Sequence, residues 1–340
     1  VGLPDVAGLG SVRAELKAAG VDLATLRPPA EPGLGDGYMA ARADAARLLR
    51  DRMPDRLVVV LPYTTAGTAL VDAAAQCGLP AAVVFQLAHP FRFQGLERQI
   101  LSWARRRRQA WIAVSDHNRH LLCSALGWCE DSIAVVRNAP LRPMPMPQSQ
   151  AGDGARASVR QELGLPPHAR LVLTVARLDP QKAPDVLLEA AVAVAATDPS
   201  VHFAWVGDGP LEASFAAQVR DRGMECRMHR LGRRSDVDRW LAAADAFALA
   251  SRYEGCPFAA LEAMRAGVPA VLSDIEPHRE IATEGREALI VPVDDADALA
   301  RAIRAVLGDK GLSARLAAAA RRRVSSASAT SGFELVLKML

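Results

Sequence analysis

Short apolar runs alternate with helix-forming segments along most of the chain, and this alternation restricts its fold more than any other feature. One such run is LVVVL at residues 57–61, which is apolar at every position. Continuously apolar strands are typical of parallel sheets covered on both faces, because parallel strands need crossover helices. In the first half we predict strands at residues 57–61, 81–85, 111–114 and 133–136, and helices at residues 68–77 and 96–110.

The alternation is sharper in the second half of the chain. The predicted strands there are residues 171–175, 201–206, 227–231, 246–250, 270–272 and 289–291, and the predicted helices are residues 184–196, 211–223, 236–243, 258–266 and 297–307. Two such series predict an α/β protein with two doubly wound, Rossmann-like domains, which suits a chain of 340 residues.

A change of composition separates the two series. Residues 141–155 read LRPMPMPQSQAGDGA, and their prolines and glycines disfavour helix and strand. We therefore predict a first domain at residues 1–142, a linker at 143–155 and a second domain at 156–325. We expect the tail at residues 326–340 to pack back on the first domain.

The start of the chain is less regular than the rest. A helix is predicted at residues 11–19 and a strand at residues 21–26, but we find no apolar strand ahead of Ser11. A Rossmann-like domain normally begins with a strand. Three explanations stay open: the first strand lies outside this chain, it is disordered, or the domain is reduced.

Charge and cysteine content exclude several classes of protein. The 41 basic and 38 acidic residues give a net charge of +3, which argues against a protein that binds nucleic acid by electrostatic attraction. The five cysteines are scattered and form no CxxC pair or Cys/His cluster, so we expect reduced thiols and no structural zinc. Without a bilayer-length apolar run or a secretory signal, we expect a soluble cytoplasmic protein, and attachment to the inner membrane surface stays open.

Residues 251–264, SRYEGCPFAALEAM, form the segment with the clearest chemical meaning. They follow a predicted strand and open a helix near Pro257, because proline suits the first helical turn. The free N–H groups of such a helix terminus bind anions. Glu254 at the loop tip and Glu262 in the helix would accept hydrogen bonds from sugar and ribose hydroxyls, with a diphosphate between them. Two glutamates at this spacing are common, so a cap and a solvated side chain are the alternatives.

A second loop carries two basic residues. In VARLDPQKAP, residues 175–184, Arg177 and Lys182 follow the first strand of the second domain and could both reach a diphosphate. Arginine offers a planar fork of donors and lysine a compact charge. The alternative is two exposed basic residues on an ordinary loop.

Two single residues are weaker candidates. Gly207 in VGDGPL follows a predicted strand, where glycine permits a tight turn and close approach of a ligand. An ordinary turn explains it equally well. His89 in QLAHPFRF follows a strand of the first domain and could donate to phosphate or sugar, although a lone histidine is more often structural.

A basic run interrupts the first domain. Arg105 to Arg108 lie between Trp103 and Trp111 and could bind an anionic membrane surface, with the tryptophans as interfacial anchors. On the helix predicted at residues 96–110, four consecutive arginines spread around the circumference. That arrangement favours a solvated helix over a single membrane face.

Taken together, these motifs resemble the retaining glycosyltransferases of family 4, which have the GT-B architecture of two Rossmann-like domains facing a cleft. The resemblance covers residues 171–309. It is looser in the first domain, through FQLAHPF, AVSDHNRHLL and IAVVRNAP. The motifs that carry it are VARLDPQKAP, VGDGPL, RLGRRSDVDRWLAAADAFALAS, EGCPFAALE with its two glutamates, and AGVPAVLSDIEPHREI.

The resemblance implies a role for each matching position. Glu254 contacts hydroxyls of the donor sugar, and Glu262 binds the ribose. Arg177 and Lys182 stabilise the leaving diphosphate, and His89 reaches sugar or phosphate from the other domain. The remaining donor-binding positions are Gly255, Cys256, Pro257 and Phe258 for sugar and phosphate, Arg233 and Arg234 beside the nucleobase, and Gly207.

The implied reaction is transfer of a hexose from a UDP- or GDP-linked sugar with retention of anomeric configuration, without metal or cofactor. The acceptor is a glycan, a glycolipid or a small molecule. Two departures stand against the pattern: only Gly8-Leu9-Gly10 represents the usual strand and Gly-rich loop, and Lys182-Ala183 replaces a Lys-Gly pair. The alternatives are a catalytically degenerate partner subunit and a nucleotide-sugar epimerase.

Overall fold

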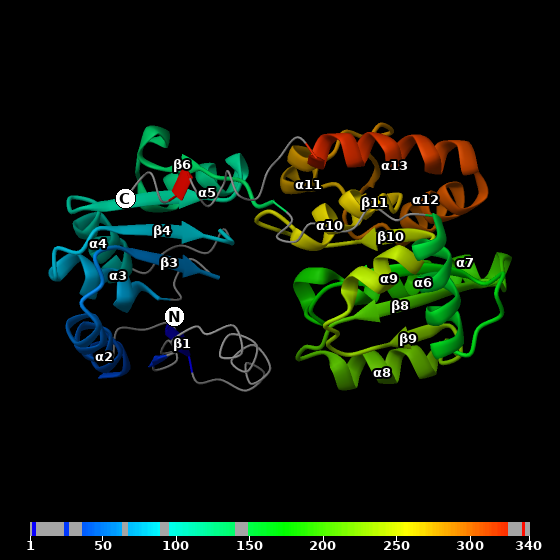
Figure 1. Cartoon of the computed structure of the whole chain (residues 1–340), viewed down its shortest axis with the longest axis horizontal. Coiled ribbons are helices and arrows are strands. Elements are labelled where there is room, and N and C mark those ends of the chain that lie inside the picture. Colours follow the sequence, from blue (N-terminus) through cyan, green and yellow to red (C-terminus); the bar gives the residue numbers. More distant parts are fainter. Residues whose placement is uncertain are drawn as a thin grey trace. The chain divides into compact units, whose positions relative to one another are not determined.

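The structure is a computed structural model that describes residues 2–4, 24–26, 36–62, 67–88, 95–139, 149–325 and 335–336. The chain folds into two compact units, unit 1 of residues 1–137 with 333–340 and unit 2 of residues 138–332. Each unit is built around a parallel sheet (Figure 1). Among the described helices, none combines the length and the apolar character needed to cross a membrane.

The main sheet of unit 1 has four parallel strands in the order β3-β4-β5-β6. They are β3 (Leu57–Leu61), β4 (Ala81–Phe85), β5 (Gln109–Ala113) and β6 (Ala134–Val135). The helices are α2 (Asp36–Arg52), α3 (Thr68–Gln76), α4 (Gly95–Ala104) and α5 (Asp116–Leu126), followed by the short η1 (Glu130–Ser132). Helix α3 packs against both α2 and α4.

A separate pair of strands precedes α2. Strand β1 (Gly2–Pro4) pairs in parallel with β2 (Ala24–Leu26). The expectation that no strand precedes Ser11 is therefore wrong. The sequence of β1, Gly-Leu-Pro, gives no strand signal, because it contains a proline and no β-branched residue. The strand is defined only by its pairing with β2, some twenty residues away. The helix predicted at residues 11–19 lies outside the described residues.

The basic run is also placed differently from the prediction. Helix α4 ends at Ala104 and β5 begins at Gln109, so the helix predicted to run to residue 110 is too long. Arg105 to Arg108 form the turn between them. Pairing explains the difference, because Gln109 lies opposite Ala81 of β4, and the Ala81 N–H donates to the Arg108 carbonyl at 3.0 Å.

Unit 2 holds six parallel strands in the order β12-β11-β10-β7-β8-β9. They are β7 (Arg170–Val175), β8 (Val201–Val206), β9 (Met228–Arg230), β10 (Ala246–Leu249), β11 (Ala270–Ser273) and β12 (Ala288–Val291). All six strands predicted here are confirmed to within two residues. The sheet core includes Phe203, Trp205 and Phe247, each almost completely buried.

The helices of unit 2 cover both faces of its sheet. They are α6 (Ser149–Glu162), η2 (Pro180–Lys182), α7 (Pro184–Thr197), α8 (Glu212–Asp221), α9 (Val237–Ala243), α10 (Phe258–Ala266), α11 (Glu276–Ile281), α12 (Ala296–Gly308) and α13 (Lys310–Ser325). Helix α7 packs on α12, α6 on α9, and α10 on α13.

Of the linker predicted at residues 143–155, the structure describes residues 149–155, and these are helical as the start of α6. Gly152 and Gly154 lie within this helix, because glycine weakens a helix much less than proline does and no proline follows Pro147 in it. Of the tail at residues 326–340, the structure describes Leu335 and Val336. Val336 is buried and belongs to unit 1.

Candidate donor site at the switch point of unit 2

The strand order of unit 2 reverses between β7 and β10, which lie side by side. From β7 the chain continues through α7 to β8 on one side, and from β10 through α10 to β11 on the other. Because such crossovers are right-handed, α7 and α10 lie on opposite faces of the sheet. The loops after β7 and β10 therefore diverge and leave a crevice at the carboxyl edge, where open α/β sheets bind ligands.

One residue from each loop meets in this crevice. Lys182, at the end of η2, donates from Nζ to Glu254 Oε1 at 2.5 Å. The two side chains are 16% and 7% exposed, so most of this ion pair is removed from water. A pair of this kind needs further hydrogen bonds to offset desolvation. The structure brings the two residues together although 72 residues separate them in the sequence.

Two neutral groups complete the surroundings of Glu254. Ser251 Oγ donates to Glu254 Oε1 at 2.7 Å, and Gln181 Nε2 lies 3.4 Å from Oε2. The Gln181 amide also donates to the Tyr253 carbonyl at 2.8 Å, which joins the two loops. Ser251 and Gln181 are absent from the predicted site. Their positions, three residues before Glu254 and one before Lys182, are the signal that could have identified them.

A buried histidine lies behind this pair. Ser273 at the end of β11 donates from Oγ to the Ser251 carbonyl at 2.5 Å, and His278 Nδ1 lies 2.7 Å from the Ser273 carbonyl. His278 is fully buried, and its Nε2 has no partner in the part of the chain that the structure describes. Burial lowers the pKa of His278, and Lys182 adds to this effect while Glu254 opposes it. The neutral ring therefore donates from Nδ1 and supports the loop that carries Glu254.

Two glycines set the spacing of the neighbouring loops. A Cβ on Gly207 would lie 2.0 Å from the Ala176 carbonyl oxygen, and its φ of 133° is itself unfavourable for other residues. A Cβ on Gly209 would lie 2.3 Å from the Leu178 carbonyl oxygen. The VGDGPL segment is thus a structural support for the loop of Arg177 and Lys182, and close approach to a ligand is not needed to explain it.

The amino terminus of α10 follows directly after Glu254. Pro257 is its N-cap, with extended ψ of 107°, and no side chain caps the helix. Its first N–H groups are therefore available to an anion. Gly255, Cys256 and Pro257 are buried, and Asn138 Nδ2 donates to the Cys256 carbonyl at 2.9 Å, which fixes the loop. Phe258 and Glu262 are partly exposed on the first two turns.

The other predicted positions have varied surroundings. The Arg177 side chain is 57% exposed and forms an ion pair with the buried Asp179 of its own loop. Ala183 takes a left-handed conformation with φ of 48°, where the resembled family has glycine. Arg233 is exposed. His89 lies outside the described residues.

Arg234 is engaged in a charged cluster rather than pointing freely to solvent. Its guanidinium binds both carboxylate oxygens of Asp236 at 2.9 and 3.0 Å, lies 3.1 Å from Glu162 and covers the Trp240 ring at 5.3 Å. Hydrogen bonding from Arg234 lowers the pKa of Asp236 to about 2. The cluster ties α6 to the start of α9. A nucleobase contact by Arg234 stays a prediction.

The described residues contain no group of three or more His, Cys, Asp and Glu side chains that could hold a metal ion. Residues 155–323 match the family model of the group 1 glycosyl transferases. The matched segment covers nearly all of unit 2 and includes both loops of the crevice, so the Lys182–Glu254 pair lies within the region that is similar to group 1 glycosyl transferases.

Similar proteins extend the match into unit 1. The UDP-Gal:alpha-D-GlcNAc-diphosphoundecaprenol alpha-1,3-galactosyltransferase of Escherichia coli is 28% identical over 251 residues, which are 71% of this chain and 63% of that protein. The lipopolysaccharide core biosynthesis mannosyltransferase LpsB of Rhizobium meliloti is 30% identical over 171 residues, 48% of each chain. The chain thus spans about half to five eighths of these relatives.

Solved structures establish the fold of the whole chain. Anabaena Alr3699/HepE, solved with UDP and glucose, matches with a TM-score of 0.78 at 20% identity and covers 96% of this chain and 88% of its own. A glycosyltransferase from Rickettsia africae matches with a TM-score of 0.75 at 15% identity, over 99% and 97% of the two chains. The chain has the GT-B fold of two Rossmann-like domains, which confirms the predicted fold class.

Proposed function

We propose that this protein is a glycosyltransferase that moves a hexose from a UDP- or GDP-linked sugar to a glycan, glycolipid or small-molecule acceptor. The observation that carries the proposal is the Lys182–Glu254 pair, buried at the switch point beside an uncapped helix terminus. The names of the relatives and the UDP and glucose bound to HepE support a nucleotide-sugar donor. The proposal extends to retention of configuration and to catalysis without metal or cofactor.

The proposed chemistry follows from the charges in the crevice. As the bond between sugar and diphosphate breaks, negative charge develops on the departing phosphate. Lys182 and the free N–H groups at the start of α10 would stabilise that charge, and they are fixed before the reaction begins. Arg177 would rotate away from Asp179 to join them. Glu254 would then accept hydrogen bonds from sugar hydroxyls with Oε2, because Ser251 and Lys182 both bond Oε1.

The ribose and base would lie further along α10 and toward β9. Glu262 would accept hydrogen bonds from the ribose hydroxyls, because it is partly exposed at the start of the second turn of the helix. Arg233 and Arg234 would lie beside the base, and His89 would reach the donor from unit 1. We further propose a cytoplasmic location, which the free thiol state of all five cysteines supports.

A panel of UDP- and GDP-linked sugars tests the proposed donor. Each would be screened for a rise in the unfolding midpoint, and the best would be incubated with candidate acceptors and its products identified by NMR. We expect one donor to stabilise the protein and to give a glycoside with the donor's anomeric configuration. Binding without any product would favour a degenerate partner subunit. A new nucleotide sugar formed without acceptor would identify an epimerase, and an inverted product would refute retention.

A further inference from the structure

The turn between α4 and β5 carries four consecutive arginines. Arg105 to Arg108 are all exposed, and none has a carboxylate partner among the described residues. Exposed arginines elsewhere are commonly paired, as Arg222 is with Glu189 and Arg230 with Glu212. Since the turn is not helical, its side chains are not spread around a helix axis. The objection that the sequence raised to a single basic face therefore no longer holds.

Aromatic rings fix two of the four side chains. The Arg107 guanidinium lies 4.5 Å from the centre of the Trp103 ring, and the Arg105 guanidinium lies 5.1 Å from that of Trp128. Arg105 also reaches Cys129 Sγ at 3.9 Å. Arg106 and Arg108 have no side-chain partner in the described part of the chain. The turn is thus anchored through alternate residues and presents the other two guanidinium groups to solvent.

A second basic segment lies at the same edge of the sheet. Helices α2 and α4 both lead into strands, β3 and β5, so both end at the amino edge of a parallel sheet. Arg50, Arg52 and Arg56 are exposed around the end of α2. Met53 stands among them with 81% of its surface exposed, the highest value of any large apolar residue described.

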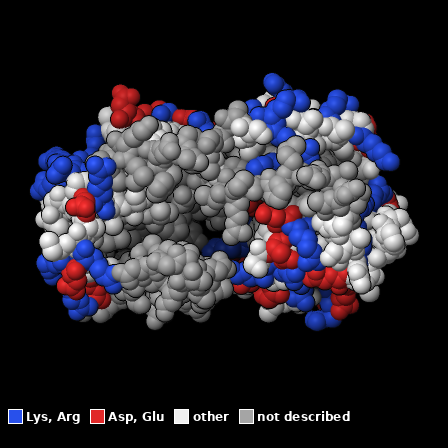
Figure 2. Space-filling view, in the orientation of Figure 1, with Lys and Arg blue, Asp and Glu red and all other residues white. Residues whose placement is uncertain are grey.

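We call Arg50, Arg52, Met53, Arg56 and Arg105 to Arg108 the basic edge. Basic side chains line this border of unit 1 at the left of Figure 2. Four acidic residues lie nearby in the sequence of elements: Asp51 at the end of α2, Asp55 between α2 and β3, and Glu130 and Asp131 in η1 ahead of β6. Glu130 is occupied by Arg119 and His120. Seven arginines against four acids leave the basic edge positive.

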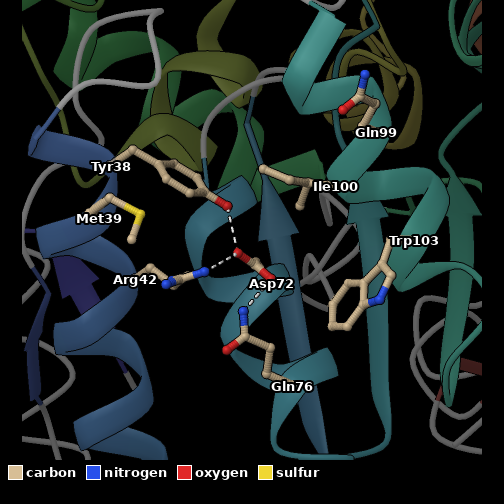
Figure 3. Close-up of a pocket in the computed structure, with 8 residues that line it drawn as sticks. All are labelled: Tyr38, Met39, Arg42, Asp72, Gln76, Gln99, Ile100 and Trp103. Atoms are coloured by element: carbon tan, nitrogen blue, oxygen red, sulfur yellow. Dashed lines mark hydrogen bonds and ion pairs between the residues drawn. The ribbon is translucent and has the colours of Figure 1, made fainter.

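A buried network holds the two segments in fixed positions. Trp103 also lines a cavity of about 380 Å³ between α2, α3 and α4 (Figure 3). On its floor, the Asp72 carboxylate accepts hydrogen bonds from Tyr38 Oη at 2.8 Å and Gln76 Nε2 at 2.9 Å, with Arg42 at 3.5 Å. Asp72 is 4% exposed, so these contacts lock α2 onto α3, and α3 packs on α4.

We propose that the basic edge docks this protein on a bilayer that contains anionic phospholipid. Guanidinium groups bind phosphate oxygens in pairs and are weakly hydrated, which suits a layer of phosphodiester headgroups. The exposed thioether of Met53 can enter the interface between them. Met53 is 81% exposed and stands among basic side chains, so it matches a surface that is both anionic and apolar.

Cosedimentation with vesicles tests this proposal independently of any transferase activity. The probes are vesicles of phosphatidylcholine alone and of phosphatidylcholine mixed equally with phosphatidylglycerol. We expect the protein to bind the mixed vesicles at low salt and to be released at high salt. Substitution of both Arg106→Gln and Arg108→Gln should lower partitioning about thirtyfold, since each basic residue near such a surface contributes a factor of about five.

The controls separate surface docking from net charge and from misfolding. The variant with Arg222→Gln and Arg230→Gln loses the same charge from unit 2 and should bind vesicles nearly as the wild type does. The Arg106/Arg108 variant should keep the wild-type unfolding midpoint, because neither side chain has a partner among the residues that the structure describes. Met53→Ser should weaken binding to the mixed vesicles at low salt, although it changes no charge. Equal losses in the two double variants, or no preference for phosphatidylglycerol, would overturn the proposal.

Discussion

Replacing Lys182 by methionine should reveal how much of the crevice depends on the buried ion pair. The substitution keeps the length of the side chain but leaves the carboxylate of Glu254, 7% exposed, without its cation. Stranding a buried charge typically costs about 3–5 kcal/mol. Ser251 still donates to Glu254 at 2.7 Å and Gln181 lies at 3.4 Å, so we expect a smaller loss of about 2 kcal/mol in the free energy of unfolding.

The reciprocal variant and the double variant complete a thermodynamic cycle. Glu254→Gln leaves the more exposed Lys182 ammonium without a carboxylate and should cost about 1 kcal/mol. The double variant has no unpaired charge and should also cost about 1 kcal/mol. The expected coupling energy is therefore about 2 kcal/mol, measured from urea unfolding curves of the four proteins. Strict additivity would refute the conclusion that the pair is a coupled buried unit.

Ligand binding provides the second readout of the same cycle. A donor present at a hundredfold excess over its Kd should stabilise the wild type by about 2.7 kcal/mol. That increment should be lost in Lys182→Met, in Glu254→Gln and in the double variant, although the double variant is at least as stable as either single variant. Arg222→Gln, which breaks an exposed ion pair of the same unit, should keep it. Donor stabilisation of the double variant equal to that of the wild type would place the donor elsewhere.

Three further predictions concern the supports of unit 2. Gly207→Ala should lower the free energy of unfolding by at least about 3 kcal/mol and abolish donor binding, because the new Cβ meets the Ala176 carbonyl oxygen at 2.0 Å. The control Gly223→Ala, with φ of 63° and open space around it, should cost about 1 kcal/mol in the same urea unfolding experiment. Similar losses in the two variants would refute the packing argument. His229 lies 3.2 Å from His202, and burial lowers the pKa of His229 from 6.5 to about 4. The neutral ring therefore contributes its full stability above pH 6.5, the pKa in the unfolded chain, and this contribution is lost as the pH falls toward about 4, the pKa in the folded protein. Unfolding curves should show a loss of about 1–2 kcal/mol between neutral pH and about pH 5, which His229→Gln removes; an unchanged pH profile in that variant would contradict the assignment. Arg160 is 2% exposed and donates to Asp245 at 2.6 Å and to the Ala169 carbonyl. Arg160→Met should therefore lower the free energy of unfolding, measured in urea, by about 3 kcal/mol. A loss no larger than that of Arg222→Gln would contradict this prediction.

The sequence predicts the strands of unit 2 well and the turns of unit 1 poorly, for identifiable reasons. Residues 171–175 and 201–206 are apolar at nearly every position, and tertiary packing only reinforces that local signal. The end of α4 depends instead on where β5 pairs with β4, since Arg105 to Arg108 themselves favour helix. Strand β1 has almost no local signal, and its partner β2 alone defines it.

The candidate site shows the same division. The residues Lys182 and Glu254 can be chosen from the sequence, because each follows an apolar strand in a loop with a glycine or proline. That the two loops face each other depends on the pairing of β7 with β10, which no local pattern reveals. Ser251 bonds Glu254 within its own loop, so its nearness in the sequence is a usable signal. His278 acts through Ser273, which donates to the Ser251 carbonyl, and this contribution becomes visible only in the assembled structure.

Titration calorimetry with UDP and GDP tests most directly whether the crevice of Lys182 and Glu254 is a donor site. We predict that the wild-type protein binds at least one of the two nucleotides. Lys182→Met should weaken this binding at least tenfold, which is equivalent to about 1.4 kcal/mol of binding free energy. The control variant Arg222→Gln should leave the binding unchanged. A wild-type protein that binds neither nucleotide, or a Lys182→Met variant that binds as tightly as the wild type, would contradict the assignment.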